Sequence, residues 1–267
     1  MRRGRRIVVA LALAVGLAAA PAASGKRSPT LRVVFPEGFT ARQMADRVAT
    51  VRRIAIAERH IRPVLTGRGY AAAVKASSPP AGFAGATSME GFLFPSLYAF
   101  GPSSTPRDLI RLQLAAFRKA WAQLDLSAAR AKGQSPYDVL IVASMVEREV
   151  SSPAERPLVA AVIDNRLAQG MPLGIDATLR YGLGIPGTKP LTAADLATDT
   201  PYNTRLHAGL PPTPIGNPGA ASLAAAAAPA DVPYLWYLRI PGTTTHYFTA
   251  DYADFCAHVQ QYGYGSC

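Results

Sequence analysis

The helix predicted over residues 136–149 limits the possible folds of this chain more than any other segment. Ser135 can cap its first turn, Pro136 suits the first helical position, and Asp138 can return a hydrogen bond from the third position. The stretch Val139–Ala143 that follows is apolar on nearly every side. Because a helix without a polar face is normally buried, the chain needs a core large enough to surround it.

Glu147 is the first acid that this apolar helix meets. At about 3.6 residues per turn it lies on the same stripe as Leu140, Ala143 and Ser144. Burial disfavours the charged form of a carboxyl group, so an acid in this position suits proton donation at neutral pH. An acid in the last turn of a helix is more commonly a solvated surface group, and the helix alone leaves both interpretations open.

Length and charge narrow the class of protein. At 267 residues the chain can hold one large domain or two unequal ones. The formal net charge is +11; Arg2, Arg3, Arg5 and Arg6 supply four of these charges and leave +7 for the remainder. Because that charge is not clustered or interleaved with aromatic residues, we do not expect a nucleic acid partner. An anionic polymer or a membrane surface suits diffuse positive charge equally well.

Residues 1–25 have the pattern of a membrane anchor or a secretory signal. The basic end precedes the apolar stretch Ile7–Leu17, and the small-residue stretch Ala18–Ala23 follows. The apolar part is shorter than the roughly 20 residues that span a bilayer comfortably, which favours cleavage. In either case, residues from about 26 onward are expected outside the cytoplasm.

The cysteine and histidine pattern does not indicate a metal site. Cys256 and Cys267 are the only cysteines, and they could pair across a short C-terminal loop if the chain is extracytoplasmic. The histidines are scattered singly, without the spacing of metal ligands. We therefore expect no metal, and whether the two cysteines form a disulfide stays open.

The rest of the pattern predicts an α+β fold. A linker or long loop is expected over residues 71–88, which are rich in Ala, Ser, Pro and Gly. Ser152 and Glu155 form a second possible capping box, before a helix that stops at Gly170. The other expected elements are a strand at 31–35, helices at 41–50, 105–123 and 220–228, and a hairpin with strands at 234–238 and 246–249.

Five segments, taken together and in order, resemble the YceG-like family of membrane-anchored endolytic murein transglycosylases. Each motif is weak alone, but the ordered set covers about residues 88–252. The segments are Glu90–Tyr98; Ala143–Glu149; Asn165–Leu167 with Gly170–Met171 and Asp176–Thr178; Pro201–Thr204 with Gly209–Pro212 and Asn217–Gly219; and His246–Thr249. Two positions depart from the family pattern, Ala177 where Pro is usual and Thr213 where Gly is common.

The resemblance implies a fold and a domain order. After the segment at 1–25, an abbreviated LysM-like strand–helix unit is expected over residues 26–75, because Pro36–Gly38 is followed by a helix. A mixed helical and β-strand YceG-like catalytic domain is expected over residues 76–267. The resemblance also implies a single-pass protein of the cell membrane with its catalytic domain outside; secretion after signal cleavage is the alternative.

The resemblance also implies roles for particular residues. The essential acid is the first Glu of the motif, which is Glu147, and Glu149 is a supporting acid. One acid suffices for a lytic transglycosylase, because it can protonate the leaving oxygen and then take the proton of the sugar's C6 hydroxyl. Substrate contacts are expected from five residues, for each of which a purely structural role is equally open: Asn203, Asp176, Thr178, Tyr202 and Phe248.

The predicted function is therefore endolytic cleavage of nascent peptidoglycan. The reaction cuts the β-1,4 bond between N-acetylmuramic acid and N-acetylglucosamine, leaves 1,6-anhydromuramic ends and limits glycan strand length, without a cofactor. Expected partners are peptidoglycan strands, the cytoplasmic membrane and peptidoglycan synthases. The alternative is a non-catalytic peptidoglycan-binding protein of the same fold.

Overall fold

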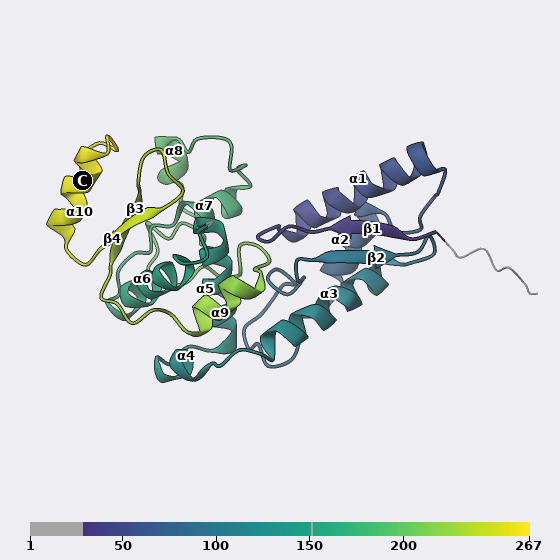
Figure 1. Cartoon of the computed structure of the whole chain (residues 1–267), viewed down its shortest axis with the longest axis horizontal. Helices are drawn as coiled ribbons and strands as arrows, with labels where there is room; N and C mark the ends of the chain where they lie inside the picture. The colour runs from purple at the N-terminus through teal and green to yellow at the C-terminus, as the bar shows by residue number, and fades with distance from the viewer. Residues whose placement is uncertain (1–28, 151) are drawn as a thin grey trace, which may run out of the picture.

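The structure, a computed structural model, describes residues 29–150 and 152–267, which form two lobes at opposite ends of the molecule (Figure 1). The N-terminal lobe, residues 29–121, contains β1 (Leu31–Val34), α1 (Ala41–Arg59), α2 (Gly67–Lys75), β2 (Leu97–Phe100) and α3 (Pro106–Trp121). The C-terminal lobe, residues 122–267, contains α4 (Ser127–Ala131), α5 (Pro136–Glu149), α6 (Arg156–Ala168), α7 (Asp176–Leu183), α8 (Ala193–Leu196), α9 (Ala220–Ala227), β3 (Trp236–Arg239), β4 (His246–Thr249) and α10 (Tyr252–Gln261).

The central helix α5 forms as the sequence predicts. Ser135 and Asp138 complete a capping box at its start. Every residue from Val139 to Val146 is buried, because α6, α7 and α9 all pack against the helix. The alanines of α9 present little side-chain volume, which lets its backbone come close to α5. The predicted core helix is confirmed, and the α+β class with it.

A two-stranded antiparallel sheet closes the N-terminal lobe. Leu31 of β1 lies opposite Phe100 of β2, and Val34 lies opposite Leu97. Leu31 and Val33 are buried, as period-2 alternation requires, and α1 packs against this strand. Beyond residue 75, where the sequence predicts the start of the catalytic domain, β2 pairs with β1 and α3 packs against α2.

The helices of the N-terminal lobe are longer than predicted. The sequence suggests an end near Thr50, but α1 runs to Arg59 because Ala55 continues its buried stripe. The predicted linker over 71–88 is wrong at its start, where residues 71–75 belong to α2. Thr66 caps that helix, and buried Tyr70 anchors it by donating a hydrogen bond to Gln113 of α3 over 2.8 Å.

The predicted second capping box does not form. The helix α6 begins at Arg156, and the Glu155 side chain makes no capping hydrogen bond. Its carboxylate instead accepts the backbone N–H of His246 and lies 2.8 Å from Nδ1 of the same residue. Glu155 thus ties α6 to β4 of the hairpin, whose two predicted strands are confirmed with Trp236 opposite Thr249.

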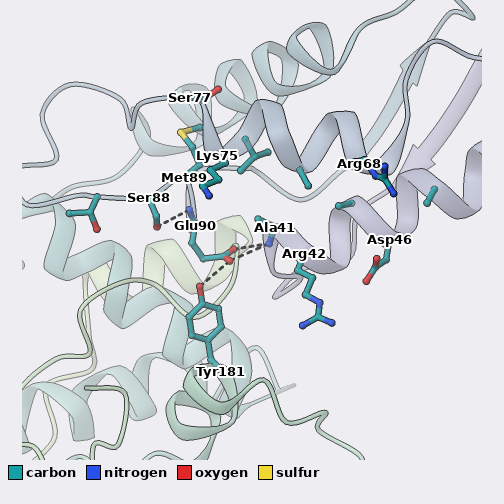
Figure 2. A pocket seen from close by; sticks show the side chains of 16 residues that line it. Ala41, Arg42, Asp46, Arg68, Lys75, Ser77, Ser88, Met89, Glu90 and Tyr181 are labelled. Atoms are coloured by element: carbon teal, nitrogen blue, oxygen red, sulfur yellow. Dashed lines mark hydrogen bonds between the residues drawn. The ribbon is translucent and has the colours of Figure 1, made fainter. Parts of the chain in front are cut away.

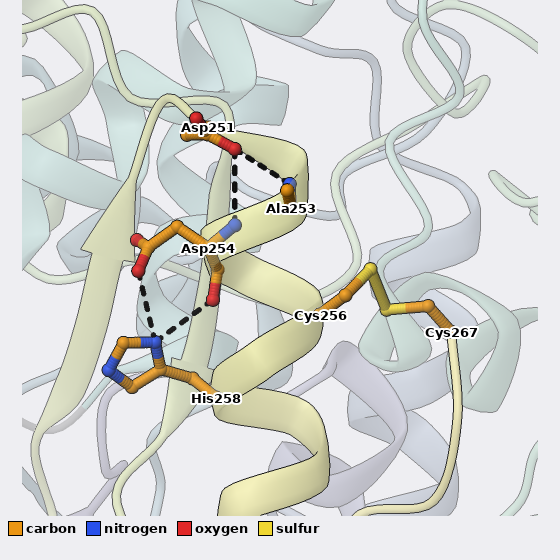
Figure 3. Close-up of a disulfide and its surroundings, with 6 residues drawn as sticks. All are labelled: Asp251, Ala253, Asp254, Cys256, His258 and Cys267. Atoms are coloured by element: carbon orange, nitrogen blue, oxygen red, sulfur yellow. Dashed lines mark hydrogen bonds and ion pairs between the residues drawn. A yellow bond between two sulfur atoms is a disulfide. The ribbon is translucent and has the colours of Figure 1, made fainter.

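The C-terminal helix α10 is held by a disulfide. Asp251 caps the helix by accepting the N–H groups of Ala253 and Asp254 (Figure 3). Cys256 and Cys267 are bonded to each other, with Cα atoms 5.6 Å apart, so the last turn of chain folds back onto α10. The sequence left this pairing open.

The predicted anchor or signal at residues 1–25 lies outside the described residues. Among residues 29–150 and 152–267, no helix is both long and apolar enough to cross a membrane.

Candidate active site

Glu147 is fixed at the end of α5 by two nitrogen donors. Its side chain is only 6% exposed. The backbone N–H of Gly219 donates to Oε2 over 3.0 Å, and a guanidinium nitrogen of Arg156 lies 3.5 Å from Oε1. Arg156 is itself held in place, because its Nε donates to the buried hydroxyl of Ser222 over 3.0 Å. Both donors stabilise a carboxylate at a position where burial alone would disfavour it.

A second acid, Glu37, lies beside this group. It belongs to the turn between β1 and α1, and its Oε2 lies 4.0 Å from the same guanidinium nitrogen of Arg156. Its other oxygen packs on Gly219 so closely that a Cβ atom added there would lie 1.8 Å from it. Burial raises the pKa of Glu37 above its ordinary value, and the charge of Glu147 raises it further, while Arg156 lowers it.

Asn217 joins the turn that carries Glu37 to the loop that carries Gly219. Gly38 donates its N–H to the Asn217 carbonyl over 2.8 Å, and Asn217 donates both its backbone N–H and its side-chain amide to the Phe39 carbonyl. On the other side, the Ser144 hydroxyl of α5 accepts the N–H of Ile215 over 3.0 Å. Contacts from both lobes therefore fix the position of Glu37 relative to Glu147.

Glu90 occupies the junction between the lobes at the start of α1 (Figure 2). Its carboxylate accepts the N–H of Ala41, the phenol of Tyr181 over 3.2 Å and the side-chain amide of Asn217 over 2.7 Å. Burial raises its pKa to about 7, although these hydrogen bonds act in the opposite direction. It lines a cavity of about 540 Å³ that includes residues of both α1 and α2.

Glu149 faces a different surface from Glu147, because residues two apart on a helix do not share a face. Its carboxylate accepts the phenol of Tyr237 on β3 over 2.8 Å. Burial raises the pKa of Glu149, the Tyr237 hydrogen bond lowers it, and the charge of Asp176 raises it. The two acids of the motif thus have different partners. Glu147 contacts Arg156 and the loop before α9, whereas Glu149 contacts the hairpin.

Two of the predicted substrate contacts lie near Glu149. The ring of Phe248 stacks on Tyr237 with centroids 5.7 Å apart, and Phe248 is only partly buried. Asp176 begins α7 and forms an ion pair with Arg205, in which both side chains are about half exposed. A sugar could reach both residues.

The other three predicted contacts hold loops together. Asn203 is fully buried; its amide donates to the carbonyls of Leu196 and Thr198. Thr178 is also fully buried and bonds to Ile175 and Thr204. Direct sugar contact by Asn203 or Thr178 does not fit this burial, because their polar atoms already have partners inside the chain.

Tyr202 packs in the same region. Its hydroxyl shares a hydrogen bond of 2.8 Å with Thr213, and its ring lies 5.2 Å from that of Tyr181. Thr213 is one of the two positions that depart from the family pattern, and its hydroxyl gives Tyr202 a polar partner within the fold. The structure thus places Tyr202 against α7, where the ring is partly buried.

Sequence reasoning assigned no role in the site to Arg156, Glu37 or Gly219. Glu37 and Gly219 appeared only as parts of turn-like motifs, and Arg156 only as a residue of the predicted second helix. These residues are far apart in the sequence, so no local spacing rule predicts that they meet. Only the tertiary contacts of the folded chain bring them together. Within residues 29–150 and 152–267, no group of three or more His, Cys, Asp or Glu side chains is arranged to hold a metal ion.

The described residues define an α+β protein with a carboxyl-centred site where its two lobes meet. The chain belongs to the YceG-like family, whose sequence model matches residues 13–261. A crystal structure of a YceG-like protein from Listeria monocytogenes is similar to it, with a TM-score of 0.66 and 27% identity over 85% of this chain and 75% of that chain.

Curated relatives carry the name endolytic murein transglycosylase. The protein from Bacillus subtilis is 35% identical over 151 residues, which cover 56% of this chain and 41% of the relative. The protein from Streptococcus pneumoniae strain R6 is 37% identical over 134 residues, covering 49% of this chain and 24% of the relative. The matched part is therefore less than half the length of these relatives.

Proposed function

We propose that this protein is an endolytic peptidoglycan transglycosylase with Glu147 as its acid. The observation that carries the proposal is the fixed position of Glu147 between Arg156 and the Gly219 amide, within a chain of the YceG-like family. The names of the curated relatives support the same activity and the same substrate class.

Glu147 performs two proton transfers in this reaction. It donates its proton to the glycosidic oxygen as the bond from that oxygen to C1 of N-acetylmuramic acid breaks. The C6 hydroxyl of the same sugar attacks C1, and the Glu147 carboxylate takes the C6 proton. Arg156 and the Gly219 amide stabilise the carboxylate between the two transfers, and they need no rearrangement to do so. The products are a 1,6-anhydro end and a free sugar hydroxyl.

A cavity lined in part by Arg148, the residue after Glu147, suits an anionic glycan. A cavity of about 430 Å³ is lined by residues of α1, α5 and α7, including Arg42, Arg148 and Arg180. Arg148 follows Glu147 directly in the chain. Three guanidinium groups around one cavity attract the carboxylates that the peptide stems of peptidoglycan carry.

The predicted substrate contacts divide into two groups in this proposal. Phe248 and Asp176 contact sugars at a more distant part of the strand, on the Glu149 side, and Glu149 supports that surface through Tyr237. Asn203, Thr178 and Tyr202 shape the loops that flank α7.

We also propose that residues 1–25 keep the enzyme at the cytoplasmic membrane, beside peptidoglycan synthases, with both lobes outside the cytoplasm. The LysM-like unit predicted over residues 26–75 then corresponds to an N-terminal lobe that extends to residue 121. Cell fractionation with N-terminal sequencing tests the anchor: membrane-bound protein that begins near Met1 supports it, and soluble protein that begins between Pro21 and Gly25 indicates a cleaved signal.

Digestion of purified peptidoglycan tests the activity. We expect glycan fragments with 1,6-anhydromuramic ends, each lighter by one water than a hydrolysed end when the products are weighed by mass spectrometry. Reducing muramic ends would indicate a hydrolase. Binding without cleavage would favour the non-catalytic alternative.

A further inference from the structure

Two cavities adjoin where the lobes meet. The cavity of about 540 Å³ lies between α1 and α2, and the cavity of about 430 Å³ lies between α1 and α7. Four residues line both of them: Arg42, Asp46, Glu90 and Tyr181. Figure 2 shows the larger cavity, with Glu90 and Tyr181 beside the start of α1. We call the two cavities together the junction groove; Arg148, the residue after Glu147, lines its smaller part.

Small residues line the groove between α1 and α2. Ala41, Ala45 and Ala49 recur at every fourth position and therefore lie along one face of α1. Gly67 and Ala71 line the same cavity from α2. A Cβ atom added at Gly67 would lie 2.5 Å from the Ala45 carbonyl oxygen, so the two helices approach closely at that point. This part of the groove offers an apolar wall that suits methyl-sized groups.

The junction groove carries an excess of positive charge. Five basic side chains line it: Arg42, Arg68, Lys75, Arg148 and Arg180. Within the part of the chain that the structure describes, none of the five forms an ion pair with an acid. Of the two acids in the lining, Glu90 is buried among its hydrogen bonds and Asp46 is exposed. Unpaired cations beside an apolar wall favour a ligand that carries both carboxylates and small apolar groups.

The peptide stem of peptidoglycan has this chemistry, because it is rich in alanine and carries free carboxylates. A bare glycan strand lacks both the alanine methyl groups and the series of spaced carboxylates. Lengths agree as well: an extended peptide of four or five residues spans about 13–18 Å. Ala41 and Ala49 lie about 12 Å apart along α1, so the apolar wall together with the smaller cavity can hold one stem.

We propose that the junction groove binds the peptide stem of the N-acetylmuramic acid at the scissile bond and makes the enzyme specific for strands that carry stems. The proposal rests on the proposed function and deepens it. Arg148 and Arg180 bind carboxylates near the sugar, and Arg68 and Lys75 bind those near the free end of the stem. Binding of the stem fixes the sugar beside Glu147 and lowers KM without adding a group to the reaction.

The test compares two matched substrates, glycan strands that keep their stems and the same strands after an amidase has removed them. Anhydro ends are counted by mass spectrometry for the full chain acting on each substrate. The wild type should cleave stem-bearing strands with a kcat/KM higher by at least about tenfold, mainly through KM, as several charge contacts allow.

Arg68 and Lys75 line only the cavity between α1 and α2, so replacing them tests the new part of the site. The double variant Arg68→Gln/Lys75→Gln should raise KM for stem-bearing strands about tenfold, the scale of two exposed charge contacts. It should leave the cleavage of bare strands unchanged. Arg62→Gln/Arg107→Gln is the matched control, because both residues are exposed, belong to the same lobe and lie outside both cavities. It should match the wild type on both substrates.

Filling the cavity tests its apolar wall separately from its charge. Ala71 is exposed on α2, where leucine is a good helix former, so Ala71→Leu should fold normally and block the groove. It should raise KM for stem-bearing strands alone. Ala72→Leu changes the next residue, which is exposed and lies outside the cavity, and should behave as the wild type. Melting temperatures close to that of the wild type would show that both variants fold.

Direct binding separates recognition of the stem from catalysis. In calorimetry with a soluble stem peptide, Glu147→Gln should bind as tightly as the wild type, because Glu147 lines neither cavity. The Arg68→Gln/Lys75→Gln variant should bind the same peptide about tenfold more weakly.

The results that would overturn the proposal can be told apart. Comparable kcat/KM values of the wild type on both substrates would show that stems are not recognised. Equal losses on both substrates in the double variant would place bare glycan in the groove, and an unchanged KM in both the double variant and Ala71→Leu would place the stem elsewhere. In these three cases anhydro ends still form and the proposed function stands. A wild type that makes no anhydro ends from either substrate overturns the proposed function, and calorimetry with the stem peptide then still decides whether the groove binds it.

Discussion

The N–H of Gly219 donates to the Glu147 carboxylate over 3.0 Å, so the first turn of α9 points at the acid that ends α5. A helix N-terminus carries a partial positive charge, which stabilises an anion placed there. This contact joins the sequence motif at the end of α5 to the motif before α9, which lie 72 residues apart.

The two acids of the α5 motif should differ sharply on substitution. Glu147→Gln should reduce the formation of anhydro ends by at least about 100-fold while leaving the melting temperature nearly unchanged, because the amide keeps its shape but cannot transfer the proton. Glu149→Gln should retain measurable activity, since its partner is Tyr237 on another surface. Initial rates for both variants under the same conditions provide the measurement. Activity in Glu147→Gln and none in Glu149→Gln would invert the assignment.

Gly219→Ala should reduce activity more than stability. Gly219 has φ −79°, which alanine adopts readily, so the backbone and its N–H can stay in place. The new Cβ would collide with the Glu37 carboxyl group, which is the end of a flexible, half-exposed side chain and can move away. We expect a change of less than about 1 kcal/mol in the free energy of unfolding and a clear loss of kcat. Gly187→Ala is the matched control, because a Cβ atom added at Gly187 has no other atom within 4 Å. Gly242→Ala is less suitable, because the positive φ of Gly242 would strain any other residue.

Arg156→Gln should destabilise the protein by about 3 kcal/mol, because removing one partner of a buried ion pair leaves the other charge uncompensated. The substitution also leaves the Ser222 hydroxyl without its Nε donor. Urea unfolding monitored by circular dichroism measures the loss. It should be smaller at pH 5 than at pH 8, because burial and the charge of Glu147 raise the pKa of Glu37, so that Glu37 is protonated to a greater extent at the lower pH. An equal loss at both pH values would contradict the shared role of Arg156.

Glu90 should make stability depend on pH in a defined window. Burial raises its pKa from 4.5 to about 7 in the folded protein, so between these values the folded state holds a proton that the unfolded chain has lost. The contribution of this group to stability therefore falls as pH rises through the window, by about 3 kcal/mol in total, and stays level above it. Glu90→Gln cannot ionise and should lack this component. Parallel curves of unfolding free energy against pH for the two proteins would rule the effect out.

Elements with strong local signals could be predicted from the sequence. The capping residues and apolar run of α5 identify both its start and its buried position, and the aromatic alternation of β3 and β4 identifies the hairpin. Glu147 could be selected for the same reason, since its place on the apolar stripe depends only on helical periodicity. Predictions from local sequence patterns fail where a side chain bonds to a partner distant in the sequence and not to the expected partner nearby. Glu155 has the spacing of a capping box, but His246 offers its carboxylate two hydrogen bonds across the fold.

The other residues of the site could not be predicted from the sequence, because they come together only through tertiary contacts, including contacts between the two lobes. Glu37 lies beside Arg156 because β1 pairs with β2 and because Asn217 binds the turn between β1 and α1. Asn203 is a different case, because the sequence left a substrate contact and a structural role equally open. In the structure its side-chain amide donates to the carbonyl groups of Leu196 and Thr198, which only tertiary structure could reveal.

The strands β1 and β2 pair with each other although an exposed connection around Ala81 and Gly82 separates them in the sequence. A protease that cuts this connection would not release the first part of the chain, because sheet hydrogen bonds and the packing of α2 on α3 still hold it. The two pieces would remain one particle, with Glu37 on one polypeptide and Glu147 on the other. Separately produced halves that restore activity on mixing would demonstrate this, and would allow the two acids to be labelled independently.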